Sequence, residues 1–229
     1  MTTPSLLRED PDWLWLDKPA GVPVFPPHAD LQGPCVLRWL LETRPEQAQP
    51  FPEGFAGGLA HRLDVSTSGL VLAARSPEAL ARARAAFAEG RLAKRYRFVT
   101  AKAVPWTAHH LTTPLAHHKR RRDRMVPQRG RSTPHRGRWY PADTRLQQVE
   151  GALWEAVITT GVMHQIRVHA ASAGLALWGD PVYGGGALPE GVAPEGVRFA
   201  LHHVGWTGLG DPPQTSPPLW WGDLLRRAP

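Results

Sequence analysis

The chain has 229 residues, of which 42% are hydrophobic, so it can bury a sizeable core and is not a disordered chain. Its formal net charge of +7, from 27 basic and 20 acidic residues, suggests a polyanionic partner. The single cysteine, Cys35, excludes intrachain disulfides and zinc sites built from paired cysteines. No apolar run reaches the ~20 residues of a membrane span, and the first residues lack the pattern of a signal peptide, so we expect a cytoplasmic protein.

The first part of the chain carries two strand patterns and a short helix pattern. We predict a strand over 13–17, a helix over 35–42 and a buried strand over 69–74, from the spacing of their apolar residues. The stretch 43–58 is rich in Pro, Gly and Gln, which is typical of a surface loop.

The clearest helix pattern lies between Ser76 and Gly90. Ser76 suits the N-cap position, a proline follows at the first helical position, and Gly90 suits the C-terminal end. Leu80, Ala83 and Phe87 recur at helical spacing and define the face that we expect to be buried.

The second part of the chain has mainly strand patterns. We predict strands over 94–100, 144–150 and 152–159, a helix over 163–173 and a last strand over 197–206. Because strands outnumber helices and the hairpin connections are short, the sequence predicts an α+β fold with a mostly antiparallel central sheet flanked by helices and loops.

The positive charge is concentrated in one part of the chain. Residues 91–138 hold 14 of the 27 basic residues and one acid, Asp123, which leaves 13 basic and 19 acidic residues elsewhere. Recurring Pro and Gly predict a loop or long hairpin in an insert-like stretch of about 105–140, which we call the basic segment. A charge run is often only a solvated loop, but arginine dominates here, and its guanidinium suits phosphates and base stacking. We expect seven residues to contact nucleic acid: Lys119, Arg120, Arg121, Arg122, Arg124, Arg129 and Arg131.

One polar stretch stands out between two apolar strand patterns. The residues HRLDVSTSG at 61–69 contain hydroxyl groups and a terminal glycine around Asp64. They indicate a polar turn, which is a common place to expose a reactive carboxylate on a rigid scaffold. An ion pair or a turn cap would be the ordinary role of such an aspartate.

Four other features of the sequence do not by themselves indicate a particular function. His164 and His169 are five positions apart and have no cysteine or acid cluster beside them, so we expect no metal site. Lys18 stands in a KPAG turn, where a lysine is normally a solvated surface charge, and Tyr96 at the start of a strand suits packing. The turn GDPVYG at 179–184 contains nothing that decides a chemistry.

Together, these segments resemble the RluA-type pseudouridine synthase family. The matching blocks stand in the family's order, and the resemblance covers about residues 10–220. The blocks are DKPAGVPV at 17–24, HRLDVSTSGLVLAAR at 61–75, KRYRFV at 94–99, HQIRVH at 164–169, GDPVYGG at 179–185 and RFALHH at 198–203. The chain departs from the family at Val162, where an arginine is usual, and at Val65 and Ser66, where a basic–acidic pair is frequent.

The resemblance implies a single catalytic domain over 1–229, without the N-terminal S4 domain that some members carry. It implies isomerisation of uridine to pseudouridine in RNA, with ribosomal and transfer RNA both open as substrates. No cofactor is expected, because the substrate supplies all the atoms. We also expect a monomer with no membrane partner.

The resemblance also assigns roles to four residues. Asp64 matches the catalytic aspartate, and the reaction needs one carboxylate near C1′ of the nucleotide. Arg167 matches the arginine that pairs with that aspartate, and such a guanidinium keeps a carboxylate charged and oriented. Arg62 matches a position implicated in opening the RNA around the flipped uridine, and Tyr96 matches the active-site tyrosine that stacks on uracil. Leucines and an isoleucine form weaker candidates for the pocket wall: Leu63, Ile166 and Leu201.

Two rival functions stay open at this level. A non-catalytic RNA-binding factor on the same scaffold would use the basic segment equally well. A nucleoside hydrolase would be expected to show an aspartate cluster for metal and ribose, which the sequence does not display. Attack of the aspartate on C1′, attack on the base and elimination to a glycal are all compatible with a single carboxylate.

Overall fold

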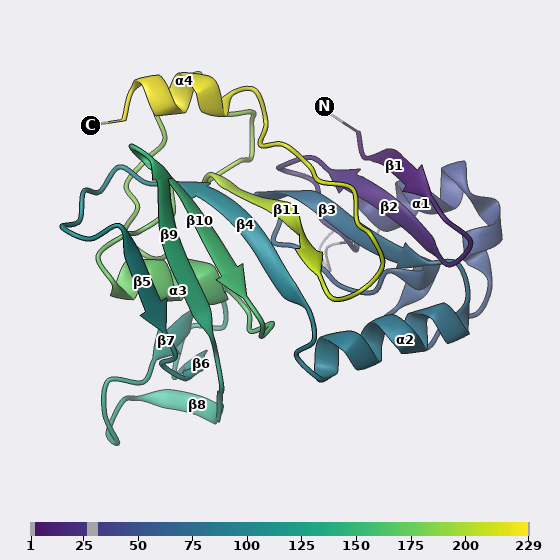
Figure 1. The fold of residues 1–229 in the computed structure, drawn as a ribbon, viewed down its shortest axis with the longest axis horizontal. Helices are drawn as coiled ribbons and strands as arrows, with labels where there is room; N and C mark the ends of the chain where they lie inside the picture. Colours follow the sequence, from purple (N-terminus) through teal and green to yellow (C-terminus); the bar gives the residue numbers. More distant parts are fainter. Residues whose placement is uncertain (1–2, 27–31, 229) are drawn as a thin grey trace. The chain divides into compact units, whose positions relative to one another are not determined.

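The computed structural model describes residues 3–26 and 32–228 (Figure 1). The chain forms two compact units. The first unit comprises Met1–Leu92, Pro194–Val197 and His202–Pro218. The second unit comprises Ala93–Ala193, Arg198–Leu201 and Leu219–Pro229. Each unit contains strands and packed helices.

The first unit is built on four neighbouring strands in the order β1-β2-β3-β11. They are β1 (Ser5–Glu9), β2 (Trp13–Lys18), β3 (Thr67–Ala74) and β11 (Leu201–Thr207), the last belonging to this unit from His202 on. Strand β2 pairs antiparallel with both β1 and β3, with Trp15 opposite Leu72. Strand β3 is buried along its whole length, because its residues are small or apolar on both faces.

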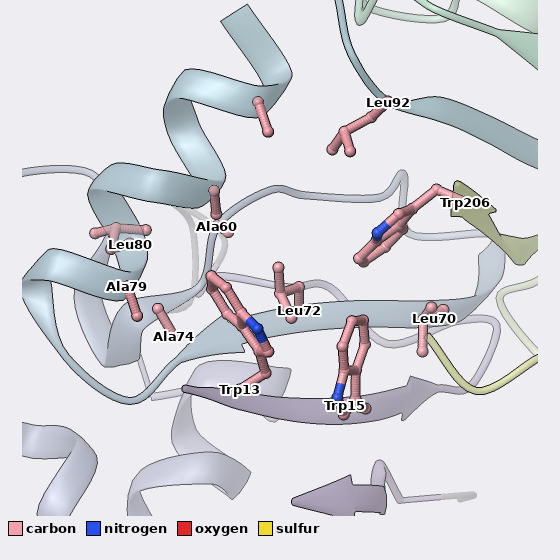
Figure 2. Packing of buried hydrophobic residues seen from close by; sticks show 12 residues of the cluster. Trp13, Trp15, Ala60, Leu70, Leu72, Ala74, Ala79, Leu80, Leu92 and Trp206 are labelled. Atoms are coloured by element: carbon pink, nitrogen blue, oxygen red, sulfur yellow. The ribbon is translucent and has the colours of Figure 1, made fainter. Parts of the chain in front are cut away.

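Helix α2 (Pro77–Ala88) covers the tryptophan-rich face of this sheet. The Ser76 hydroxyl accepts a hydrogen bond from the backbone N–H of Ala79 at 3.2 Å, which confirms the predicted N-cap. Figure 2 shows Leu80 of the helix in one cluster with Trp13 and Trp206 of the sheet. The predicted buried face of the helix is therefore confirmed.

The predicted loop over 43–58 is more ordered than its composition indicated. Helix α1 (Val36–Thr43), capped by the Cys35 thiol, leads into two short 3-10 helices, η1 (Pro45–Ala48) and η2 (Ala56–Gly58). Gln47 is buried, and its amide donates hydrogen bonds to the carbonyls of Gly57 at 2.8 Å and Ala74 at 2.9 Å. The Gln49 amide also donates to the Arg75 carbonyl at 2.7 Å, so two glutamine side chains hold the stretch against the end of β3.

The second unit has a four-stranded antiparallel array in the order β4-β10-β9-β5. Its strands are β4 (Ala93–Val99), β10 (Leu153–Ile158), β9 (Thr144–Glu150) and β5 (Ala108–Leu111). Strands β9 and β10 form the predicted hairpin, whose turn contains Gly151 at a φ of 49°. Helices α3 (Gln165–Ser172) and α4 (Trp221–Arg226) complete the unit.

The basic segment is not the loop or single long hairpin that its Pro and Gly content predicted. It contains a separate three-stranded antiparallel sheet in the order β7-β6-β8, besides strand β5. The strands are β6 (Leu115–His118), β7 (Met125–Pro127) and β8 (His135–Tyr140). Leu115 and Met125 anchor it through a small apolar cluster with Val168 of α3. Strands β6 and β7 have only four and three residues, and β8 is rich in polar and exposed side chains, so none of them shows the apolar alternation of a half-buried strand.

The remaining predictions differ from the structure only at element ends. The last strand begins at Leu201 rather than at 197, and the helix predicted over 163–173 spans Gln165–Ser172. The α+β class with a mostly antiparallel sheet is confirmed. Within the described residues, no helix is both long and apolar enough to cross a membrane.

Candidate active site

Asp64 lies in the turn that leads into β3 of the first unit. The segment before it runs beside β3, where Ala60 N–H donates to the Leu72 carbonyl at 2.9 Å and Leu72 N–H donates to His61 Nε2 at 3.2 Å. The Asp64 carbonyl accepts from Thr67 N–H at 3.0 Å, which closes the turn. The polar turn that the sequence predicted is therefore present, with the Asp64 side chain half-buried.

The residues next to Asp64 in the sequence differ in their exposure to solvent. Leu63 is 6% exposed and Ser66 is also buried, whereas Arg62 and Val65 are exposed. Exposure of Arg62 suits its predicted contact with RNA. Glycine is required at Gly69, because a Cβ there would lie 2.2 Å from the carbonyl oxygen of His203.

Lys18 is not the solvated surface charge that the sequence indicated. Its side chain is fully buried at the end of β2, and its ammonium donates to the carbonyls of Val22 at 2.6 Å, Pro19 at 3.0 Å and Val65 at 3.1 Å. The Val65 carbonyl also accepts from Gly21 N–H at 2.8 Å. The KPAG turn therefore fastens the backbone directly after Asp64. A sequence pattern cannot show this, because the carbonyls that satisfy the ammonium come from irregular backbone.

Burial lowers the pKa of Lys18 to about 7, while the negative charges of Asp64 and Asp17 act in the opposite direction. The side chain is therefore a charged anchor at low pH and a neutral one at high pH. Burial also raises the pKa of Asp17, whose neighbour Lys18 opposes this effect.

The second unit holds Arg167 in a buried ion pair with Asp180. Arg167 Nε lies 2.7 Å from Asp180 Oδ2, and its terminal nitrogen lies 3.0 Å from Oδ1, so both carboxylate oxygens are engaged. Arg167 is 5% exposed and Asp180 is fully buried. Asp180 Oδ1 also accepts from the backbone N–H of Val182 at 3.0 Å and of Tyr183 at 3.3 Å. The turn at 179–184 is therefore not chemically neutral, as the sequence suggested, because it supplies the carboxylate that orients Arg167.

Two aromatic rings complete the environment of Arg167. Its guanidinium lies 4.3 Å from the ring centroid of Phe199 and 5.1 Å from that of Tyr183. Tyr183 is fixed in turn, since its hydroxyl accepts from Met125 N–H at 2.9 Å and lies 2.9 Å from His164 Nδ1. Burial raises the pKa of Tyr183 to about 12, so the hydroxyl keeps its proton. Arg167 is thus rigid before any substrate is present.

The predicted pairing of Arg167 with Asp64 stays a prediction, because the two residues belong to different units. The residue that the sequence reasoning missed is Asp180. Its only signal was an aspartate in a Gly/Pro turn that matches a family block.

Tyr96 lies on β4 of the second unit and is 8% exposed. It stands opposite Ala156 of β10, and alternate residues of its strand, Lys94 and Phe98, are also buried. Burial lowers the pKa of Lys94 to about 8. The predicted packing of Tyr96 is therefore present, whereas stacking on uracil remains a prediction.

The seven residues predicted to contact nucleic acid lie on the turns of the basic segment. Six of them are exposed, and Arg124 is half-buried. Arg121 pairs with the one acid of this region, Asp123, at 3.1 Å. Val162, which stands where the family usually has an arginine, packs instead against the apolar cluster around Leu115 and Met125.

The three weaker candidates for a pocket wall are all buried. Leu63 is 6% exposed, Ile166 is 4% exposed and Leu201 is 5% exposed. The part of the chain that the structure describes contains no group of three or more His, Cys, Asp or Glu residues that could hold a metal ion. His169 serves the fold, since it lies 2.8 Å from both the Thr144 hydroxyl and the Thr113 carbonyl.

Residues 12–172 match the family model described as RNA pseudouridylate synthase. The chain belongs to this family. The resemblance to RluA-type pseudouridine synthases is confirmed by curated relatives named ribosomal large subunit pseudouridine synthase D. The relative from Zymomonas mobilis is 31% identical over 215 residues, which cover 88% of this chain and 64% of that protein. The relative from Nitrosomonas europaea is 34% identical over 209 residues, which cover 86% of this chain and 56% of that protein.

Solved structures of other pseudouridylate synthase family proteins share the fold. Human RNA pseudouridylate synthase domain containing 1 is 21% identical in sequence and superposes with a TM-score of 0.68. The superposition covers 99% of this chain and 96% of the human chain. Human RNA pseudouridylate synthase domain containing 4 has a TM-score of 0.69 at 20% identity, with 98% and 92% covered. The chain spans about half to two thirds of the length of the curated relatives that it matches.

Proposed function

We propose that this chain isomerises uridine to pseudouridine in structured RNA, and that Asp64 supplies the reacting carboxylate. The observation that carries this proposal is the fastening of the Asp64 turn, in a member of the RNA pseudouridylate synthase family, by the buried Lys18 and by Gly21. A reactive group needs a rigid backbone position, because a small displacement from the reacting atom lowers the reaction rate strongly. The names of the curated relatives favour ribosomal RNA over transfer RNA as the substrate.

The reaction balances within the nucleotide. The C1′–N1 bond breaks, the uracil turns, a bond forms between C5 and C1′, and the C5 proton is finally replaced by a proton on N1. A carboxylate stabilises positive charge at C1′ or attacks that carbon, so a single aspartate suffices. A hydrolase would need a second acid or base to activate water. No cofactor enters this scheme, and the products contain every atom of the substrate.

The other three residues serve the same scheme. Arg167 keeps the carboxylate of Asp64 charged and oriented, and its rigidity from Asp180 and Tyr183 supports that role. Tyr96 stacks on uracil and relays the C5 proton. Arg62, which is exposed beside Asp64, fills the space that the flipped uridine leaves in the RNA.

Product analysis tests the proposal directly. The purified chain is incubated with ribosomal RNA and with transfer RNA that lack modifications, and the digested nucleosides are then separated. Pseudouridine supports the proposal, whereas free uracil would identify a hydrolase. An RNA that is bound but returned unchanged would identify a non-catalytic RNA-binding factor.

Removing charge from the basic segment should weaken RNA binding and make it less dependent on salt. The test variant carries Lys119→Gln, Arg120→Gln and Arg122→Gln, three exposed residues. Each lost phosphate contact reduces the slope of log K against log salt by about 0.7 to 0.9. The control variant carries Arg84→Gln, Lys102→Gln and Arg227→Gln, which removes equal charge elsewhere. Equal slopes for the two variants in a salt titration would contradict the role of the basic segment.

Replacing Lys18 should change how stability depends on pH. The folded-state pKa of Lys18 is lowered to about 7 from its ordinary value of 10.5, so between these pH values the unfolded chain binds more protons than the folded one. The stability contribution of Lys18 therefore rises with pH through this window. Lys18→Met removes this ionisation, so its melting temperature should fall further below that of the wild type as pH increases from 7 to about 10.

The matched control for this experiment is Lys102→Met, since Lys102 is exposed. Its melting curve should stay parallel to that of the wild type across the same pH range. If Lys18→Met also ran parallel to the wild type, the folded and unfolded chains would hold equal numbers of protons at this position.

A further inference from the structure

A cavity of about 620 Å³ lies in the second unit between α3 and the basic segment. Its walls are formed by Val168 and Ala171 of α3, by strand β7 and by the turn over 129–134. Figure 1 shows α3 close to β7, in agreement with their contacts. A cavity of this size can enclose most of a small organic molecule. Neither Tyr96 nor Arg167 is among its lining residues, so it is not the site proposed for the reacting uridine.

The turn that closes the cavity is already ordered by its own hydrogen bonds. Arg129 N–H donates to the Thr133 hydroxyl at 3.0 Å, and that hydroxyl donates to the Gly130 carbonyl at 2.9 Å. Gln128 N–H donates to the Pro114 carbonyl at 2.9 Å, which ties the turn to the three-stranded sheet. The shape of the cavity therefore does not depend on a ligand to order this wall.

The cavity is lined by cationic side chains and by no carboxylate among the described residues. Arg124 and Arg129 line it, and the Arg124 guanidinium lies 5.7 Å from the ring centroid of Tyr183. His118 also lines it, and its Nδ1 accepts from the backbone N–H of Arg120 and of Arg121, both at 3.1 Å. The neutral imidazole therefore carries its proton on Nε2, which is a further donor. These groups together favour an anion such as a phosphate.

The rest of the lining is largely apolar. Met125, Val126, Pro127, Pro134 and Val168 present hydrocarbon surface. A free inorganic anion would gain nothing from such walls, and an uncharged apolar ligand would bring no counter-charge to the arginines. A nucleotide satisfies both, because a base has a planar apolar face and its phosphate is a bidentate acceptor for arginine.

We propose that this cavity holds one unpaired nucleotide of the RNA substrate, distinct from the uridine that reacts. The base packs between α3 and β7, and the adjacent phosphate binds Arg124 and Arg129. The inference rests on the proposed function, because it takes RNA as the substrate.

Two RNA hairpins that differ at one position test the proposal. In one, 2-aminopurine is an unpaired bulge; in the other, it is paired within the stem. Enclosure of a base is worth about a five- to hundredfold gain in affinity, so the wild-type protein should bind the bulged hairpin about tenfold more tightly. Burial should also change the 2-aminopurine fluorescence of the bulged hairpin only.

Ala171→Phe fills the cavity from the α3 side without changing any charge, and it should make the two affinities equal. Ala103→Phe places the same side chain at an exposed alanine of the second unit and should retain the preference. Where Ala171→Phe does not fold, Arg129→Gln serves as the second variant and should also reduce the preference. Its control is Arg122→Gln, which removes an exposed charge outside the lining and should weaken both hairpins equally.

The proposal is overturned if the wild-type protein binds both hairpins equally, or if Ala171→Phe keeps the preference. Competition by uridine monophosphate but not by inorganic phosphate supports a nucleotide site, and equal competition by both would overturn it in favour of an anion site. These readouts do not require turnover. If the protein prefers the bulged hairpin but forms no pseudouridine, only the proposed function is contradicted. If it forms pseudouridine but binds both hairpins equally, only the proposed nucleotide site in the cavity is contradicted.

Discussion

Asp64→Ala should release no tritium from RNA labelled at C5 of uridine, while the variant still folds and still binds the RNA. The proposed reaction needs a carboxylate at C1′, which an alanine side chain does not supply. Asp64 is only half-buried and lies in a turn whose backbone is held by Lys18 and Gly21, so removing its side chain leaves those bonds in place. The expected loss is therefore in the rate of the chemical step, by more than about 10³-fold.

Three measurements accompany the tritium assay. The melting temperature and the dissociation constant for RNA should change little from those of the wild type. Asp12→Ala, which removes an exposed carboxylate from the same unit, should retain full turnover. Appreciable tritium release by Asp64→Ala would overturn the assignment of the reacting group.

Arg167→Lys should lower turnover by about ten- to a hundredfold, and Arg167→Ala should lower it further. Lysine keeps the positive charge but cannot engage both oxygens of Asp180 or stack between Phe199 and Tyr183 as the planar guanidinium does. The Ala variant also leaves a fully buried carboxylate without its counter-charge, which destabilises the fold by about 3 to 5 kcal/mol.

Turnover at substrate saturation separates an effect of Arg167 on the chemical step from its effect on the stability of the fold. Arg167→Lys should reduce kcat at temperatures well below its melting point. Arg145→Lys, at an exposed position of β9, is the matched control and should leave both kcat and melting temperature unchanged. Near-normal kcat in Arg167→Lys would show that charge alone is sufficient at this position.

The elements that the sequence predicted correctly are those whose signals are local. The helix after Ser76 has its cap, its proline and its buried face within fifteen residues, so no distant contact is needed to recognise it. Strand β3 is a continuous run of small and apolar residues, which indicates burial on both faces. The hairpin of β9 and β10 has its turn glycine between two alternating segments.

What could not be predicted depends on distant partners. Lys18 is a surface residue by composition, and only the fold places three carbonyls around its ammonium. Asp180 becomes the partner of Arg167 because a turn brings it to the start of α3. The strands of the basic segment are stabilised by Val168, which is far from them in sequence. In each case the local sequence around the residue predicts a solvent-exposed turn or loop, and the contact that changes this comes from a residue distant in sequence.

The lone cysteine offers a practical consequence. Cys35 is 2% exposed and is engaged as the cap of α1, so a thiol reagent reaches it only when that part of the first unit opens. Its labelling rate therefore reports the free energy of that opening, without a fluorophore or an engineered probe. Added RNA that slows the labelling would reveal protection of this unit on binding. The same inertness leaves a cysteine introduced elsewhere as the single site that reacts rapidly.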